Sequence, residues 1–261
     1  MADGDYERGR GREIDALAAR LRRLAAERAS APVRRCSVLV LNGWAASPHA
    51  WDMCAFERER VYTYLEQLDG LPEERVASAE PDESFLLVGW SMGGSGALRI
   101  ACRHPGRMAG LVLVAATPRM MEERESGWRG MSPRRLAALE YGLKATHGEG
   151  FFGVPEGRPN PYMMDSDENL ERGLEYLRTT DLREDLSRVR LACPARILQS
   201  ERDGIVRREN AEFLRSVLPN SSVEVVPGGE HALPVSVPEL IDAAVADVCA
   251  AAVKFKAAEK R

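Results

Sequence analysis

Short, continuous runs of apolar residues alternate with amphipathic stretches along most of the chain. The clearest runs are residues 36–41, 84–88, 110–116 and 195–199, with shorter candidates at 61–64 and 223–226. Such runs are typical of strands that are buried on both faces of a parallel sheet. Helical patterns lie between them at 94–103 and 207–218, and a last helix is predicted at 238–255. Because parallel strands need crossover connections, this alternation predicts an α/β fold with a mostly parallel central sheet flanked by helices.

The alternation breaks between residues 118 and 180. Ser132-Pro133 is a typical helix start, and Ser166 begins a second helix after a loop rich in Gly and Pro. Leucines, among them Leu139 and Leu177, form one apolar face on each helix. Two helices inserted between strands predict a small helical cap over the carboxyl edge of the sheet, where open α/β sheets bind ligands. Residues 1–261 are therefore expected to form a single domain that contains this insertion.

A further helix is predicted before the first strand, over residues 5–30. Ile14, Leu17, Leu21 and Leu24 recur there at three- and four-residue steps in a background of Arg, Glu and Ala. This period predicts an amphipathic N-terminal helix with a narrow apolar stripe.

Composition narrows the function classes. Of the 261 residues, 44% are hydrophobic and 29% are charged, as in a globular chain. The 36 Lys and Arg residues against 40 Asp and Glu give a formal net charge of −4, which does not favour nucleic acid. No apolar run has the length of a membrane span, and the first residues lack the pattern of a signal peptide. We expect a cytoplasmic protein with neither a nucleic-acid nor a membrane partner.

Cysteines and glycines give no sign of a bound ion or cofactor. The five cysteines are scattered, with no C-x-x-C pair, which favours buried free thiols over disulfides or zinc. His, Cys, Asp and Glu show no spacing typical of a metal site, and the glycines of 89–96 form no nucleotide-binding motif. Neither a metal nor a cofactor is expected.

The strongest chemical motif is Gly89-Trp90-Ser91-Met92-Gly93, between an apolar strand and a helical pattern. A turn sharp enough to expose a serine hydroxyl above a sheet needs small residues two positions to either side. Ser91 is therefore the candidate nucleophile, and it needs a histidine to take its proton.

The base and the acid are sought at the carboxyl ends of later strands. His231 follows the last strand and is the candidate base, whereas His49, His104 and His147 are interpreted as surface residues or helix-end partners. Asp203 follows the strand at 195–199 and is the candidate acid. Asp203 can also be a simple turn residue before a glycine, and Glu201 and Asp181 are weaker candidates for the acid.

Two backbone N–H groups are predicted to bind the oxyanion of a tetrahedral intermediate. One belongs to Met92, directly after the nucleophile, and the other to Trp44, in the loop after the first strand. The side chains of Trp44 and Trp90 lie beside these donors, so we interpret them as an apolar wall for an acyl chain. The alternative is that both only fill the core.

At these residues the sequence resembles the α/β-hydrolase superfamily and, within it, the pimeloyl-[acyl-carrier protein] methyl ester esterases of biotin synthesis. The resemblance covers roughly residues 36–118 and 170–245, and it is carried by the segments 42–44, 89–94, 173–183 and 203–206. The chain departs from the family pattern in having Asn42 where a histidine is usual and a shortened segment at 61–83. It also has a helix in place of a first hairpin.

The resemblance implies the reaction and the partner. The expected activity is hydrolysis of the methyl ester that masks the distal carboxylate of a pimeloyl chain on acyl-carrier protein. Phe151 and Phe152 are expected to help roof the slot for this chain, and Arg134 and Arg135 to meet the phosphate or the acidic carrier. Residues 129–144 hold four basic residues against one acidic residue, although this is also compatible with an ordinary solvated helix face.

Two alternatives stay open at this point. The first is a generic short-chain carboxylesterase or thioesterase that is indifferent to the carrier. The second is a non-catalytic protein of hydrolase fold that binds a partner or small ligand.

Overall fold

The fold is built on a parallel sheet. The structure, a computed structural model, describes residues 36–146, 148, 152, 154, 156–163 and 165–259, with side chains up to residue 253. In this part of the chain six strands lie in the order β2-β1-β3-β4-β5-β6, and every neighbouring pair is parallel. They are β1 (Cys36–Leu41), β2 (Arg60–Tyr62), β3 (Ser84–Trp90), β4 (Met108–Val114), β5 (Ala195–Ser200) and β6 (Ser221–Val226). The predicted α/β fold is confirmed.

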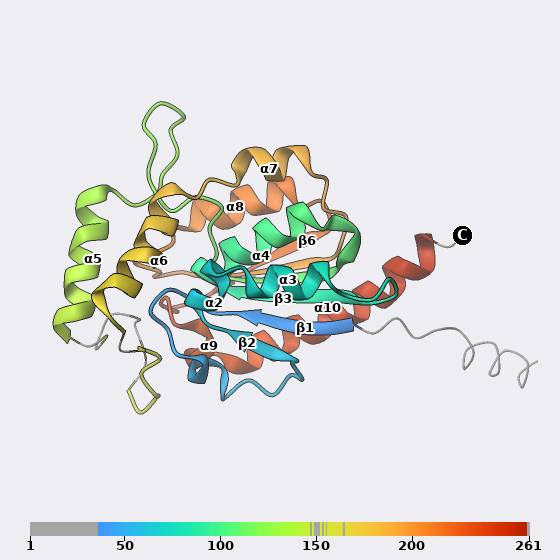
Figure 1. Ribbon diagram of the computed structural model, residues 1–261, viewed down its shortest axis with the longest axis horizontal. Coiled ribbons are helices and arrows are strands. Elements are labelled where there is room, and N and C mark those ends of the chain that lie inside the picture. The colour runs from blue at the N-terminus through green and yellow to red at the C-terminus, as the bar shows by residue number, and fades with distance from the viewer. Residues whose placement is uncertain are drawn as a thin grey trace, which may run out of the picture. The chain divides into compact units, whose positions relative to one another are not determined.

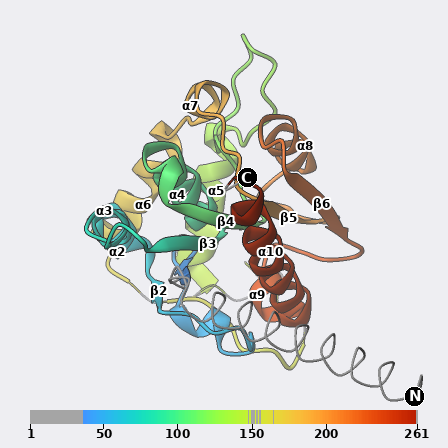
Figure 2. The same cartoon turned by 90° about the vertical axis from the view of Figure 1, so that its right-hand side faces the viewer.

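Helices cover both faces of this sheet (Figure 2). α10 (Pro238–Glu259) packs on one face, and α4 (Met92–Arg103) and α8 (Arg208–Val217) pack on the other. The other described helices are α2 (Tyr64–Leu68), α3 (Leu71–Ala77), α5 (Pro133–Thr146), α6 (Asp167–Thr179), α7 (Arg183–Arg188) and α9 (Leu233–Ser236), with 3-10 turns η1 (Pro48–Trp51) and η2 (Pro105–Arg107). The helix predicted for residues 5–30 lies outside the described residues.

Side chains of the central strands alternate between two apolar layers. In β1, Leu39 and Leu41 pack on the side of α4, whereas Val40 packs on the side of α10. In β3, Leu87 and Val88 repeat this alternation. Both layers exclude water, so most positions on both faces of these strands are apolar, and the serines Ser37 and Ser84 lie near the strand starts. This is why the strands are continuous apolar runs in the sequence.

Between β4 and β5 the chain leaves the sheet and forms α5 and α6. Figure 1 shows both helices beyond the carboxyl ends of the strands. α5 begins at Pro133, and the Ser166 side chain caps α6 by accepting a hydrogen bond from the Asn169 N–H at 3.2 Å. Arg119 and Asp181 form a β-bridge where the segment leaves and rejoins the core. The two helices therefore begin where the sequence pattern predicts them.

The segment after β1 differs from the prediction. β2 ends at Tyr62, so the strand predicted for 61–64 is shorter, and α2 and α3 follow it. Thr63 and Glu66 form a reciprocal capping box, in which each side chain accepts the backbone N–H of the other residue. α2 and α3 have only five and seven residues, too few for a clear helical period. Local capping specifies α2, and hydrophobic periodicity does not.

Candidate active site

A sharp turn places Ser91 between β3 and α4. Its φ of 55° and ψ of −120° lie in a region that side-chain-bearing residues rarely adopt. The backbones around it are so close that a Cβ on Gly93 would lie 2.0 Å from the Leu41 carbonyl oxygen. A Cβ on Gly89 would lie 2.5 Å from the Gly93 carbonyl oxygen. Glycine is therefore required on both sides of the serine, as the sequence motif indicates.

The structure brings the three predicted catalytic side chains together. His231 Nε2 lies 2.9 Å from Ser91 Oγ, and His231 Nδ1 lies 2.9 Å from one Asp203 carboxylate oxygen and 3.1 Å from the other. The side chains of His231 and Asp203 are 4% and 1% exposed. Because an ionised carboxylate only accepts hydrogen bonds, the Nδ1 atom carries the proton and Nε2 is available to accept the serine proton.

The backbone that follows Asp203 fixes its carboxylate. Oδ1 accepts hydrogen bonds from the N–H groups of Ile205 at 2.8 Å and Val206 at 2.9 Å. These donors orient the carboxylate and offset the loss of water around it. The two weaker candidates for the catalytic acid make other contacts. Glu201 accepts a backbone N–H in the loop after β6, and Asp181 pairs with arginines.

The other described histidines are not at this site. His49 pairs with Asp52 at 2.9 Å on the surface, where its side chain is 82% exposed. His104 ends α4 and contacts Glu73 at 3.3 Å. His147 lies outside the described residues.

A narrow apolar slot lies in front of Ser91. Its volume is about 20 Å³, which is room for about one water molecule. Of the side chains that the sequence assigns to substrate binding, those of Trp44, Trp90 and Phe152 line it. Four more apolar residues also line it, which the sequence analysis did not select for this purpose: Met120, Leu139, Leu177 and Ile205. The leucines were visible only as members of helical stripes, and a stripe does not show what it faces.

The backbone beside Ser91 offers both candidate oxyanion donors. Met92 begins α4, so its N–H lies at the helix N-terminus next to the serine. From the loop after β1, Gly43 lies so close that a Cβ on it would be 3.4 Å from Ser91 Cβ. Trp44 follows, and its indole N–H donates to the Leu170 carbonyl oxygen at 3.1 Å, which ties this loop to α6.

Asn42 braces the same loop. Its side-chain amide N–H donates to the Ala46 carbonyl oxygen at 2.7 Å, and its side-chain oxygen accepts the Trp51 indole N–H at 3.0 Å. The side chain of Asn42 is fully buried, so both bonds are needed to offset its desolvation. The residue that departs from the family pattern thus has its own role in holding the candidate oxyanion loop.

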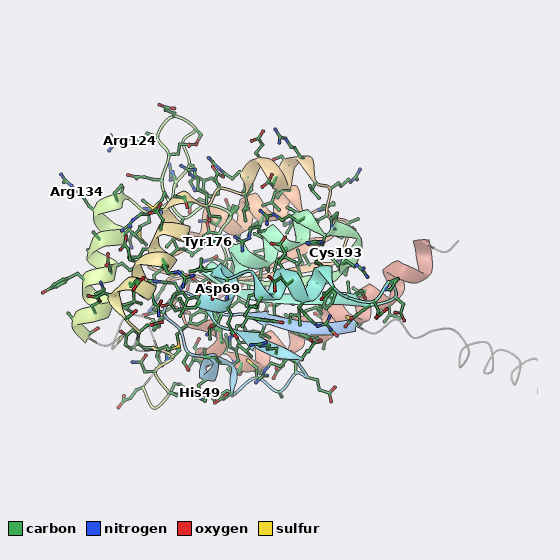
Figure 3. All side chains as sticks on the ribbon, in the orientation of Figure 1. His49, Asp69, Arg124, Arg134, Tyr176 and Cys193 are labelled. Atoms are coloured by element: carbon green, nitrogen blue, oxygen red, sulfur yellow. The ribbon has the colours of Figure 1, made fainter. Side chains whose placement is uncertain are left out.

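The two selected arginines do not line the slot. Arg134 and Arg135 are both exposed on α5, and Figure 3 shows Arg134 pointing away from the sheet. Arg135 donates to the Gly204 carbonyl oxygen, one residue after Asp203, and so joins α5 to the loop of the candidate acid. Phe151 lies outside the described residues.

Other elements offset part of the positive charge expected for residues 129–144. Arg129 lies 3.6 Å from a carboxylate oxygen of Glu209, and Lys144 contacts Glu140 at 2.9 Å and Asp167 at 3.1 Å. The sequence could not show the acids from α8 and α6 among these partners.

Metal ligands, membrane spans and cysteines were also considered in the sequence analysis. Among the residues the structure describes, no group of three or more His, Cys, Asp and Glu is placed to hold a metal ion. Within the same part of the chain, no helix is long and apolar enough to cross a membrane. The five cysteines form no disulfide, and Cys54 and Cys193 are buried as predicted, but Cys36 is exposed at the start of β1.

The parallel sheet, the serine turn and the hydrogen-bonded Ser-His-Asp chain define a class of protein. The chain belongs to the Alpha/beta hydrolase family, whose sequence model matches residues 8–244. Among curated proteins, it is similar to the pimeloyl-[acyl-carrier protein] methyl ester esterase of Yersinia enterocolitica, with 31% identity over 244 residues that cover 81% of this chain and 92% of that protein. The protein of the same name from Salmonella typhi is 30% identical over 228 residues, covering 76% of this chain and 87% of its own.

Solved structures show the same fold. An esterase from Exiguobacterium antarcticum matches with a TM-score of 0.64 at 18% identity, covering 83% of this chain and 93% of its own. A hydrolase from Pseudomonas aeruginosa PA01 matches with a TM-score of 0.59 at 20% identity, covering 84% and 91%. The resemblance drawn from the sequence motifs, to the superfamily and to its pimeloyl-carrier esterases, is confirmed.

Proposed function

We propose that this protein is a serine carboxyl-ester hydrolase that demethylates pimeloyl-acyl-carrier protein methyl ester in biotin synthesis. The observation that carries the proposal is the 2.9 Å contact between His231 Nε2 and Ser91 Oγ, continued by Asp203 and facing an apolar slot. The names of the relatives supply the substrate class. The proposed partner is an acyl-carrier protein, and the proposed site of action is the cytoplasm.

In the first half of the reaction Ser91 Oγ attacks the ester carbonyl carbon while His231 Nε2 takes the hydroxyl proton. Asp203 stabilises the imidazolium that forms. The carbonyl oxygen becomes an oxyanion, which accepts hydrogen bonds from the N–H groups of Trp44 and Met92. When the tetrahedral intermediate collapses, the bond to the methoxy oxygen breaks, and His231 returns the proton so that methanol leaves.

In the second half a water molecule takes the place of methanol. His231 removes its proton, and the resulting hydroxide attacks the carbonyl carbon of the acyl-serine ester. The same oxyanion donors act again, and the bond to Ser91 Oγ breaks as His231 gives the proton back to it. The free carboxylate of the pimeloyl chain is the product.

The slot must widen to admit an acyl chain. A volume of about 20 Å³ holds about one water molecule. Its roof consists of Leu139 from α5, Leu177 from α6 and Phe152 from the loop between these helices. In this proposal residues 118–180 are a cap on a single domain, and the cap moves away from the sheet when substrate enters.

The carrier contact is assigned to the exposed face of α5. Arg134 and Arg135 stand there without lining the slot, so they are placed to meet an acidic protein surface or a phosphate rather than the apolar chain. We include Trp44, Trp90, Phe151 and Phe152 as contacts of the acyl chain.

Methanol release tests this proposal. Wild type and Ser91→Ala are each offered a carrier-bound pimeloyl methyl ester and, separately, short-chain methyl esters. We expect wild type to favour the carrier substrate by orders of magnitude in kcat/KM, and Ser91→Ala to lose activity on both substrates because the nucleophile is gone. Turnover of short esters alone would leave a generic esterase or thioesterase, and failure of Ser91 to react with a fluorophosphonate would leave a non-catalytic binding protein.

Charge reversal distinguishes a carrier-dependent hydrolase from a generic esterase or thioesterase in the same assay. Arg134→Glu should raise KM for the carrier substrate and leave short esters unaffected, because Arg134 is exposed on α5 and only the carrier offers acidic groups to it. Arg135 is kept unchanged in this variant, because it donates to the Gly204 carbonyl oxygen beside Asp203. Arg188→Glu is the matched control, since Arg188 is an exposed arginine on α7 that pairs with Glu184 of its own helix.

A further inference from the structure

The loop that carries His231 is attached to three different parts of the molecule. The Ser200 hydroxyl at the end of β5 donates to the Glu230 carbonyl oxygen. The Trp90 indole N–H donates to the carbonyl oxygen of His231 itself at 2.9 Å. The Ala232 N–H donates to the Phe152 carbonyl oxygen at 2.9 Å. The peptide groups on both sides of the base are thus held in place.

Of these three partners, Trp90 is the one joined to the nucleophile by a peptide bond. It is the last residue of β3, directly before Ser91, and its side chain is fully buried. Its ring centroid lies 5.7 Å from the imidazole of His231, with the planes inclined at 40°. It lies at the same distance from the ring of Phe152, inclined at 49°. The Trp90 side chain therefore contacts both the backbone carbonyl oxygen and the imidazole ring of His231.

We propose that Trp90 is a positioning residue that sets the reach of His231 to Ser91 through its hydrogen bond to the histidine carbonyl. The serine and the histidine are 140 residues apart, so their separation depends on how accurately the loop after β6 is placed. The indole hydrogen bond fixes the position of that loop relative to Trp90, the residue next to the nucleophile. Any small shift of β3 then moves the nucleophile and the base together.

Removal of the bond frees the imidazole to drift without removing a reacting group. Ångström-scale misplacement of a catalytic group can lower the rate by about 100-fold. Because the bond touches neither substrate nor oxyanion, its loss acts on kcat more than on KM. The inference rests on the serine-hydrolase mechanism proposed above and not on the identity of the acyl substrate.

The test replaces the indole N–H and keeps the ring. Trp90→Phe retains an aromatic side chain, and benzothienylalanine at position 90 retains the size of the indole with sulfur in place of the N–H. With a short activated ester, we expect both variants to lose about 10- to 100-fold in kcat per reactive serine. KM should stay nearly unchanged in the benzothienylalanine protein, which keeps the ring that lines the slot, and should rise in Trp90→Phe, which makes that wall smaller. The number of reactive serines is counted by fluorophosphonate titration, so partly misfolded protein does not distort the result.

A matched control exists on the same chain. The Trp128 indole N–H donates to the Arg119 carbonyl oxygen at 3.1 Å, outside the slot. Trp128→Phe removes the same kind of bond at a place that does not touch His231. We expect it to keep the wild-type kcat per reactive serine and the wild-type pH profile.

A second readout reports on the histidine without turnover. The proton that His231 Nδ1 shares with Asp203 is expected to give a far-downfield proton NMR signal, which reports on the geometry of this hydrogen bond. We expect this signal to shift or broaden in both Trp90 variants and not in Trp128→Phe. Wild-type kcat and an unchanged signal in the benzothienylalanine protein would overturn the inference. A wild-type protein without esterase activity would overturn the proposed function instead, and the NMR comparison would still decide the role of Trp90.

Discussion

The conformation of Ser91 depends on neighbours that have no side chains. A methyl group on Gly93 would lie 2.0 Å from the Leu41 carbonyl oxygen, so β1 and α4 would have to separate. We expect Gly93→Ala to lower the free energy of unfolding by about 3 kcal/mol. We also expect it to remove hydrolytic activity, because the turn that exposes the serine would relax. Urea unfolding with an esterase assay measures both effects.

Gly106→Ala is the control for this substitution. A Cβ on Gly106, in η2, would meet no atom within 4 Å. Its unfolding midpoint and activity should equal those of wild type. Equal midpoints for all three proteins would show that β1 and α4 are less tightly joined than the distances indicate.

Single residues of the site could be predicted where the chain supplies their context. Ser91, Asp203 and His231 each follow a strand, and parallel strands bring their carboxyl ends to one edge of a sheet. Order along the chain was therefore sufficient to bring them together. The bond from Trp90 to His231 was not visible, because it depends on the direction of one indole ring and not on its position in the sequence.

At the scale of elements, an ion-paired junction joins the two ends of the segment that bears α5 and α6. Asp181 lies 2.6 Å from Arg119 and 2.7 Å from Arg183, and the Leu182 N–H donates to the Pro118 carbonyl oxygen at 3.0 Å. Burial by itself would raise the pKa of Asp181, but hydrogen bonds from Arg183 and Arg119 outweigh it and lower the pKa from 3.8 to about 2. The junction therefore favours the ionised carboxylate.

This shift predicts how stability depends on pH. A carboxylate whose pKa is lower in the folded protein stabilises it above the unfolded pKa, and this contribution is lost as the pH falls toward the folded value. Asp181→Asn should therefore lower the free energy of unfolding by about 1–2 kcal/mol at pH 7, allowing for solvent screening. The difference from wild type should stay constant down to about pH 4 and shrink below it.

Urea unfolding of both proteins at pH 7, 4 and 3 measures this difference. Glu184→Gln is the control, because Glu184 pairs with Arg188 on the surface of α7 and such exposed pairs contribute little. A difference that grows below pH 4 would contradict the assignment of the stabilisation to Asp181.

Elements differ in how far the sequence could predict them. The long helices α4, α8 and α10 carry apolar faces that repeat over several turns, so periodicity locates them. α2 and α3 are too short to repeat, and the signal in the sequence was the Thr63 to Glu66 capping box, which a search for periodic faces passes over. Residues 119–131 form bridges between Met121 and Met131 and between Glu123 and Trp128 that follow no period at all.

At the scale of the whole molecule, thiol reactivity reports on the packing of the core. Burial raises the pKa of Cys54 to about 12, and those of Cys102 and Cys193 to about 11. Cys36 is exposed at the amino end of β1, away from the carboxyl ends where Ser91 lies. Iodoacetamide at pH 8 should therefore alkylate Cys36 first in the folded protein and leave esterase activity intact.

Peptide mapping by mass spectrometry checks this prediction, with protein unfolded in urea as the control in which all five cysteines react. Labelling of Cys54 and Cys193 as fast as Cys36 in the folded protein would mean that the two apolar layers open far more often than their burial suggests.

The lining of the slot is the feature of the molecule that the sequence predicted least. Its lining joins Met120, Leu139, Leu177 and Ile205 from four separate stretches of the chain. Which leucine of a stripe faces the slot is decided by how α5 and α6 lie on the sheet, and that angle is a property of packing. For the same reason, the sequence does not show that Glu209 of α8 lies near Arg129 or that Asp167 of α6 lies near Lys144.

The junction at Arg119 and Asp181 also has a consequence for the evolution of proteins with this fold. The two residues are 62 positions apart and adjacent in space, so the segment between them leaves and rejoins the sheet at one place. Recombination can lengthen, shorten or exchange such a segment without altering strand register or the spacing of the triad. Lineages built on this core can therefore acquire new substrates by replacing a module, while the hydrolytic chemistry is inherited unchanged.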